Sequence, residues 1–190
     1  MKNLIALIAA LLVVPAVQAA DSAGSISADA PRTYESSVRI IPTFGTAAFA
    51  PGKVDLGALG DTTAGGLFVD FGRGMLTGET GILAMSGDID TGDNRAAVNV
   101  DSWSIPLFAK FNFSGNPHST IFAKVGAMTY DPGDNGDLNV MGVAGLGGAI
   151  PLGRNSAINL DATYNRLFQN DGDLAELQGV ALLGGLSFGF

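Results

Sequence analysis

Hydrophobic residues recur at every second position over long stretches of this chain, which is the period of a β-strand. The last eleven residues show this clearly, because one parity is almost entirely large and apolar while the other is mostly small. The large residues are Val180, Leu182, Leu186, Phe188 and Phe190. An apolar strand edge exposed to water would aggregate. The pattern therefore favours a strand whose apolar face meets lipid and whose edge pairs with the first strand of a closed barrel.

The same alternation predicts eight strands separated by clusters of turn residues. They cover Ser37–Phe49, Thr63–Met75, Glu79–Gly87, Ser102–Phe113, Ser119–Tyr130, Leu138–Leu152, Ile158–Asn165 and Glu176–Phe190. Pro42 predicts a bend or a local gap in the first strand. The parity of the third strand stays open, because Ile82 and Ala84 compete with Leu83 and Met85 for the outward face.

Composition and length indicate the same fold class. Hydrophobic residues make up 47% of the chain, yet no charge-free stretch of the predicted mature chain predicts a membrane-spanning helix. The nearest candidate, Leu138–Gly153, contains five glycines and a proline, which a lone helix tolerates badly. The predicted mature length of about 171 residues suits eight strands of about 10 residues with their loops. We therefore expect an all-β fold, an eight-stranded antiparallel up-and-down transmembrane β-barrel.

The first nineteen residues have the pattern of an export signal. Lys2 precedes an apolar run from Leu4 to Val14, and Val17-Gln18-Ala19 is a small-residue cleavage pattern. The run is too short to span a bilayer. We expect a cleaved signal peptide at residues 1–19 with cleavage after Ala19, a flexible periplasmic leader at 20–36 and the barrel at 37–190. The chain has no Cys, so neither a lipid anchor on cysteine nor a disulfide is available.

The charges of the loops predict the orientation. If the leader is periplasmic, the outer loops fall near Ala50–Thr62, Asp88–Val100, Asp131–Asp137 and Gln169–Leu174. These loops hold ten Asp residues against only Lys53 and Arg95. The opposite connections are shorter and nearly neutral, as in bacterial outer-membrane barrels. Aromatic girdles are expected near the outer ends (Phe49, Trp103, Tyr130, Phe168) and near the inner ends (Phe71, Phe111, Phe113, Phe188, Phe190).

Several strands resemble those of the small OmpA/OmpX/opacity-type outer-membrane β-barrel proteins. The segments that carry the resemblance are Ser104–Phe113 (SIPLFAKFNF), Ser119–Ala127 (STIFAKVGA), Gly142–Leu152 (GVAGLGGAIPL), Ile158–Phe168 (INLDATYNRLF) and the Phe-terminated last strand. In such proteins the C-terminal strand is recognised by the barrel-assembly machinery. The resemblance therefore implies that Gly185, Phe188 and Phe190 form the assembly signal.

Five charged residues fall on strand faces that we expect to point inward. They are Arg39, Asp70, Lys110, Lys124 and Asp161. Buried charges must pair, because an isolated ion in an apolar environment costs several kcal/mol, on the order of 5 or more. We therefore expect an interior ion-pair network that fills the lumen, since an eight-stranded barrel is only just wide enough to be filled by side chains. The alternative is a polar path that conducts ions.

Catalytic and ligand-binding signals are weak. His118, the only histidine, falls in a predicted periplasmic turn, so a Ser/His/acid unit has nothing to build on. The acidic stretches Asp88–Asn94 and Asp131–Asp137 superficially resemble Ca²⁺ loops but lack the EF-hand order. We expect solvated turns there, with weak bridging to lipopolysaccharide by divalent cations as a lesser option. No cofactor site is expected, and a net charge of −8 argues against nucleic acid as a partner.

The sequence favours a non-enzymatic outer-membrane barrel with a filled polar interior and acidic surface loops. The expected role is envelope integrity or surface interaction and adhesion, with outer-membrane lipids, lipopolysaccharide and the barrel-assembly machinery as partners. Three alternatives stay open. The first is a narrow pore or small-solute channel, the second is a lipid-modifying enzyme, and the third is a secreted lipocalin-like barrel whose apolar faces would point inward.

Overall fold

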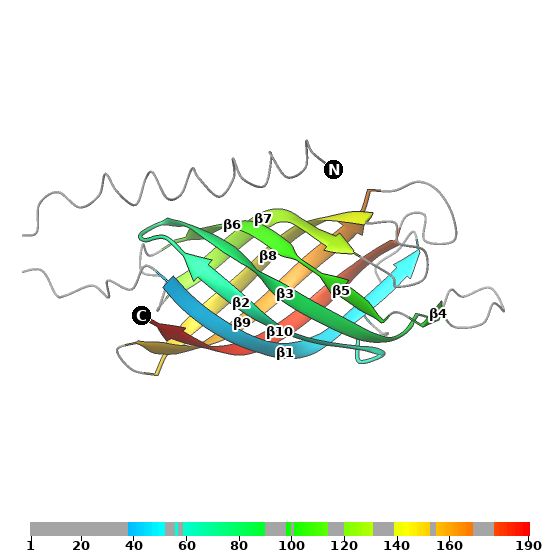
Figure 1. Ribbon diagram of the computed structural model, residues 1–190, viewed down its shortest axis with the longest axis horizontal. Coiled ribbons are helices and arrows are strands. Elements are labelled where there is room, and N and C mark those ends of the chain that lie inside the picture. Colours follow the sequence, from blue (N-terminus) through cyan, green and yellow to red (C-terminus); the bar gives the residue numbers. More distant parts are fainter. Residues whose placement is uncertain are drawn as a thin grey trace, which may run out of the picture.

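The computed structural model describes residues 38–51, 56, 59–89, 98–99, 101–113, 120–130, 139–152, 155–168 and 177–190. Its strands are β1 (Val38–Pro51), β2 (Thr62–Phe71), β3 (Leu76–Ile89), β4 (Val98–Asn99), β5 (Ser102–Ser104), β6 (Pro106–Asn112), β7 (Thr120–Tyr130), β8 (Asn139–Pro151), β9 (Ser156–Leu167) and β10 (Leu177–Gly189). All pairings are antiparallel, and β10 pairs with β1 to close the sheet. Because β4, β5 and β6 all pair with β3, they form one interrupted strand. The fold is the predicted closed eight-stranded barrel (Figure 1).

The interruption between β5 and β6 lies at Ile105, directly before Pro106. Proline has no backbone N–H, so it cannot donate to the ladder. Side chains of the flanking strands supply bonds instead: Thr80 Oγ1 donates to the Pro106 carbonyl at 2.8 Å, and Thr129 Oγ1 accepts from the Ile105 N–H at 2.9 Å. The single strand predicted at 102–113 is therefore split, while the register with β3 continues across the break.

The two ends of the barrel differ. The Phe190 N–H donates to the Val38 carbonyl at 3.1 Å, so the start of β1 and the chain end lie together, at what we call the terminal end (Figure 1). The opposite end is called the far end. Pro42 leaves the expected gap, because the β1–β10 ladder skips Ile41 and Pro42. At the terminal end the β2–β3 turn places Gly72 and Gly74 at φ 106° and 74°, a region that favours glycine.

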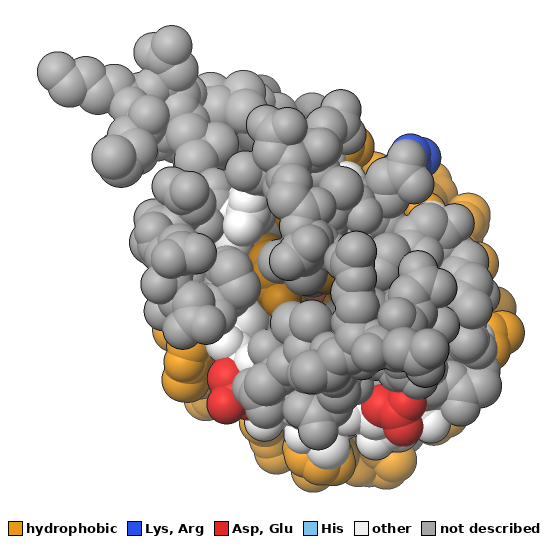
Figure 2. Space-filling model, turned by 90° about the vertical axis from the view of Figure 1, so that its right-hand side faces the viewer, with side chains coloured by type: hydrophobic (Ala, Val, Ile, Leu, Met, Phe, Trp, Pro, Cys, Tyr) orange, Lys and Arg blue, Asp and Glu red, His pale blue; other side chains and the backbone are white. Residues whose placement is uncertain are grey.

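The outward face of the wall is apolar. Large exposed residues on it include Phe44, Leu67, Ile82, Trp103, Ile105, Ile121, Val125, Leu146, Leu160, Leu182 and Leu186. Seen from the far end, hydrophobic atoms line the right and lower edges of the barrel (Figure 2). In the described part of the chain, no helical segment reaches the length and apolarity that a membrane crossing requires.

The structure settles the parity of the third strand and corrects two aromatic assignments. Leu83 and Met85 point inward and are buried, whereas Ile82 on the alternate parity is 52% exposed. Phe49 and Tyr130 are not girdle residues. They are 5% and 2% exposed, because they share the inward parity of their strands. The prediction went wrong because it used their place near the strand ends and ignored their parity.

The far half of the lumen is filled mainly by apolar side chains, with a few buried polar ones such as Ser104 and Asn165. The apolar side chains come from every long strand and belong to one contiguous cluster, which includes Ala47, Phe49, Leu83, Met85, Met128, Tyr130, Met141, Val143, Leu167, Leu177 and Ala181. Small residues alternate with large ones, which allows the layer to close at the density of a protein interior. The barrel therefore has two apolar regions, one on the outside of the wall and one in the far half of the lumen.

Candidate functional site

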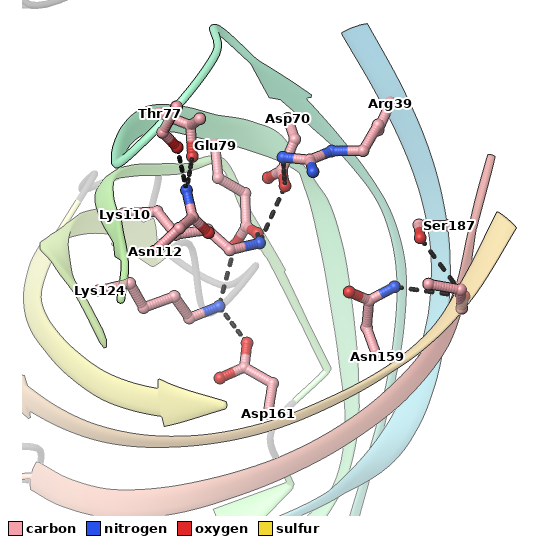
Figure 3. Close-up of polar contacts among 12 residues, drawn as sticks. Arg39, Asp70, Thr77, Glu79, Lys110, Asn112, Lys124, Asn159, Asp161 and Ser187 are labelled. Atoms are coloured by element: carbon pink, nitrogen blue, oxygen red, sulfur yellow. Dashed lines mark hydrogen bonds and ion pairs between the residues drawn. The ribbon is translucent and has the colours of Figure 1, made fainter. Parts of the chain in front are cut away.

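Six charged side chains meet in the half of the lumen nearer the terminal end, and we call them the lumen network (Figure 3). Asp70 Oδ2 accepts from Arg39 Nη2 at 2.7 Å and from Lys110 Nζ at 2.8 Å. Lys110 also lies 3.4 Å from Glu79 Oε2, and Lys124 Nζ donates to Glu79 Oε1 at 2.9 Å. Lys124 then pairs with Asp161. The order is Arg39–Asp70–Lys110–Glu79–Lys124–Asp161, with alternating charge throughout.

The strand register would by itself bring like charges together. Asp70 on β2 lies directly opposite Glu79 on β3, and Lys110 on β6 lies directly opposite Lys124 on β7. Like charges in such cross-strand positions repel. The Lys110 ammonium, however, reaches across β3 and contacts both carboxylates, so each pair is stabilised by the other.

Charge in the network is balanced and almost fully buried. Three cations (Arg39, Lys110, Lys124) face three carboxylates (Asp70, Glu79, Asp161), so the formal sum is zero. The side chains are at most 5% exposed, except Asp161 at 12%. Such burial costs several kcal/mol per ion, on the order of 5, unless each charge has close partners. The alternating order gives each inner member two partners and each end member one.

Aromatic rings and glycines shape the space around the two lysines. Lys110 Nζ lies 4.0 Å from the ring centroid of Phe122, and Lys124 Nζ lies 4.7 Å from that of Phe108, both within range of a cation–π interaction. A Cβ on Gly147 would come within 2.6 Å of the Phe122 ring. Glycine on β8 therefore leaves the room that the ring occupies.

Asn112 closes the lumen on the terminal side of the network. Its side-chain amide donates to the Thr77 hydroxyl at 3.1 Å and to the Gly74 carbonyl in the β2–β3 turn at 3.2 Å (Figure 3). Its backbone N–H donates to the Met75 carbonyl at 2.6 Å. Asn112 is fully buried, so it ties the interior to the turn at this end of the barrel.

A small cavity lies beside the network. Its volume is about 20 Å³, and its lining includes Thr43, Glu79, Lys110, Asn159 and Asp161. About 10–15 Å³ of this kind of space holds one water molecule. Within the lumen network, Asp70 Oδ1, Asp161 Oδ1 and Arg39 Nη1 are buried without a hydrogen-bond partner. The space admits a water molecule at most, and a hydrated ion would not fit.

The five charged residues singled out in the sequence thus lie in one connected group, but Glu79 was missed. It sits at the centre of the network and was overlooked because the parity of the third strand was left open. A charge count was the signal that could have found it. The five residues sum to +1, so a neutral interior required one more carboxylate. Glu79 shares the inward parity of Leu83 and Met85.

The residues of the predicted assembly signal lie on both faces of β10. Phe188 and Phe190 point outward and are 44% and 75% exposed. Gly185 faces the lumen, where a Cβ would come within 2.6 Å of the Pro42 carbonyl oxygen. The predicted cleavage position Ala19, the leader, His118 and almost all of both acidic loops lie outside the described residues. Within the described ranges, no three His, Cys, Asp or Glu side chains are grouped as a metal site would need.

Comparison with solved structures shows the class of fold. The chain is similar to Neisserial surface protein A (NspA), with 12% identity, a TM-score of 0.57, and coverage of 82% of this chain and 98% of that one. It is also similar to the outer membrane protein AlkL, solved in DMPC lipid bilayers, with 12% identity, a TM-score of 0.52 and coverage of 88% and 96%. The fold is that of the small eight-stranded outer-membrane β-barrels, as the sequence resemblance implied.

Comparisons at the level of sequence add no relative. No family model matches the chain, and no curated protein matches it. Since the identities to the solved structures are low, those likenesses establish the architecture, and the function has to be argued from the residues of this chain.

Proposed function

We propose that this chain is a non-enzymatic integral outer-membrane barrel with a closed lumen, serving envelope integrity or contact at the cell surface. The observation that carries the proposal is the neutral lumen network, in which every charged group has at least one ion-pair partner. It joins residues of β1, β2, β3, β6, β7 and β9 across the interior, and the cavity beside it has a volume of only about 20 Å³. An ion that crossed the lumen would have to break several buried ion pairs.

The apolar wall supports membrane insertion. Its outward face combines large side chains with almost no charge, whereas six charged groups point inward. This is the reverse of the arrangement in a water-soluble lipocalin-like barrel and matches a barrel in lipid. The acidic loops predicted at the far end favour an orientation with both termini periplasmic and the loops extracellular.

The closed lumen can be tested by electrical recording. Protein refolded into planar bilayers is expected to give no stable, reproducible single-channel openings. As a control for sensitivity, a channel-forming porin recorded under the same conditions is expected to give regular openings. Regular openings of the unmodified protein would contradict the closed lumen and favour the narrow-pore alternative.

The two cellular roles can be separated by changing the loops. In cells lacking the protein, a barrel with its far-end loops replaced by short turns is expected to restore resistance to detergent if the barrel itself supports the envelope. The same variant is expected to lose any surface binding. A loop variant that reaches the outer membrane in normal amount, yet restores neither detergent resistance nor surface binding, would contradict an envelope role.

We also propose that Gly185, Phe188 and Phe190 act in assembly. Phe188 and Phe190 lie on the outward face of β10 at the terminal end, where a periplasmic assembly factor would meet the chain. Deleting Phe190 is expected to lower the amount of folded protein in cells. Refolding of the same purified variant into detergent is expected to be nearly normal. An equal loss in both settings would indicate a structural role only.

A further inference from the structure

The outward wall carries one charged side chain among the strand residues whose side chains the structure describes. Arg39, Asp70, Glu79, Lys110, Lys124 and Asp161 all point inward, whereas Arg166 on β9 is exposed. No described residue forms an ion pair with Arg166. A cation on a lipid-facing surface costs about 2–4 kcal/mol at the bilayer midplane and about 0–1 kcal/mol near the interface. Arg166 lies one residue before the end of β9, at the far end of the barrel.

Polar and aromatic side chains surround Arg166 on the same face. Gln178 of β10 is its direct cross-strand partner, and the Tyr164 hydroxyl donates to Gln178 Oε1 at 2.6 Å. This bond leaves the Gln178 amino group free to donate. On the other flank, Gly142 of β8 is opposite Arg166, and the ring of Phe168 lies over it, since a Cβ on Gly142 would be within 2.7 Å of the ring. We call Tyr164, Arg166, Phe168 and Gln178 the rim cluster.

We propose that the rim cluster binds the phosphate group of a glycolipid in the outer leaflet, of the phosphorylated lipid A type. A guanidinium beside an amide donor offers several N–H groups to phosphate oxygens, and arginine binds such planar sets of acceptors with two parallel bonds. Tyr164 and Phe168 have the amphipathic or apolar rings that lie at the level of lipid headgroups. The inference rests on the proposed membrane placement and orientation.

The distribution of charge around the far end favours Arg166 as the place where an anionic lipid binds. At the far end the exposed charged groups among the described residues besides Arg166 are the carboxylates Asp61 and Asp101. In the view from this end, basic atoms lie at the upper right of the barrel and acidic atoms lie along its lower side (Figure 2). Carboxylates repel a lipid phosphate, so an anionic lipid is expected to settle at β9 and β10 rather than elsewhere around the described wall.

The test is native mass spectrometry of the folded full-length barrel in detergent, titrated with diphosphorylated lipid A and with the same lipid after dephosphorylation. The unmodified protein is expected to bind the phosphorylated lipid about tenfold more tightly, as charge-assisted hydrogen bonds allow. Arg166→Gln is expected to abolish that preference and Arg166→Lys to retain part of it. Tyr164→Phe and Gln178→Leu are each expected to reduce it about threefold.

Arg73 provides the matched control. It is an exposed arginine at the terminal end, so Arg73→Gln removes the same charge from the opposite rim and is expected to keep the preference. A preference that survives Arg166→Gln, or that Arg73→Gln removes equally, would overturn the proposal. The proposal would also be overturned if inorganic phosphate, at the same concentration as the lipid, displaced the lipid from the protein. Insertion into vesicles is recorded on the same samples, because a protein that fails to insert contradicts the proposed function, whereas an inserted barrel without the preference contradicts this site alone.

Discussion

The two halves of the lumen are filled by opposite chemistry. Near the terminal end, six charged groups neutralise one another in a single chain of ion pairs. Near the far end, the same eight strands present mainly Met, Leu, Phe and small residues, with a few buried polar side chains such as Ser104 and Asn165 among them. Both halves are filled by side chains. They differ in their response to substitution. Shortening an apolar side chain costs stability in proportion to the atoms removed, whereas removing one charged group leaves its partner without an ion pair.

The comparison indicates that the charged half contributes specificity more than stability. Replacing a buried ion network by well-packed apolar residues is often neutral or stabilising. The lumen network, however, works in one register only. Since side chains alternate, a slip of β3 by one residue would turn Glu79 outward and leave Lys110 and Lys124 without their shared carboxylate. An apolar layer tolerates such a slip better, because neighbouring outward positions are apolar too.

The largest effect is expected from removing the central carboxylate. Glu79→Gln leaves Lys110 and Lys124 with one partner each, and the free energy of unfolding is expected to fall by about 3–5 kcal/mol. The measurement is urea unfolding in lipid vesicles, followed by the fluorescence of Trp103, the single tryptophan.

The matched double variant isolates the charge effect. Glu79→Gln with Lys110→Met leaves two neutral pairs, Arg39 with Asp70 and Lys124 with Asp161. It is expected to be more stable than Glu79→Gln alone. If the two substitutions simply add, the alternating order of charges has no energetic meaning, and the contrast between the halves disappears.

A smaller, graded effect is expected in the apolar half. Met141 is fully buried, so Met141→Ala leaves a cavity and is expected to cost about 2–4 kcal/mol in the same unfolding assay. Leu146→Ala on the outward face of the same strand is the control, because Leu146 is 62% exposed and lipid can fill the space. Equal losses at both positions would show that the far half is not tightly packed.

Alternation was enough to predict the barrel because lipid outside and side chains inside impose opposite demands on successive residues. It placed Lys110, Lys124 and Asp161 inward, and the structure joins them. It failed where a strand carries apolar residues on both parities. In β3 the outward Ile82 and the inward Leu83 are equally hydrophobic, because the far half of the lumen is itself apolar. For that reason the sequence did not reveal that Glu79 points inward.

Phe49 and Tyr130 were misplaced for the same physical cause. An aromatic residue near a strand end belongs in a girdle only if its parity is outward, and an apolar lumen can take it instead. The strand break before Pro106 was missed for a different reason. The Thr80 and Thr129 side chains, which bond to the Pro106 carbonyl and the Ile105 N–H, lie on other strands. Such bonds depend on register, which the spacing of one segment does not reveal.

Gly147 tests how closely the charged half is packed, because the Phe122 ring that contacts Lys110 occupies the space beside it. Gly147→Ala would push the Cβ against the Phe122 ring and to within 2.5 Å of the Leu160 carbonyl oxygen. The expected loss is about 1–3 kcal/mol, typical of overpacking. Gly184→Ala is the control, since the atom nearest to its Cβ, Leu160 Cδ2, would lie at an ordinary van der Waals distance of 3.7 Å. A loss at Gly184 as large as at Gly147 would point to glycine's backbone freedom rather than to space for the ring.

The smallest effect is expected at the end of the network. Asp161 has one cationic partner, Lys124, and is the most exposed member at 12%. Asp161→Asn keeps an oxygen that accepts from Lys124, and Lys124 keeps Glu79, so the expected cost is about 1–2 kcal/mol. The measurement is the same urea titration, run beside Glu79→Gln. A network whose members act in order must lose more from its centre than from its end. If Asp161→Asn destabilises the barrel as much as Glu79→Gln does, the six groups behave as one unit, and position within the chain of ion pairs does not matter.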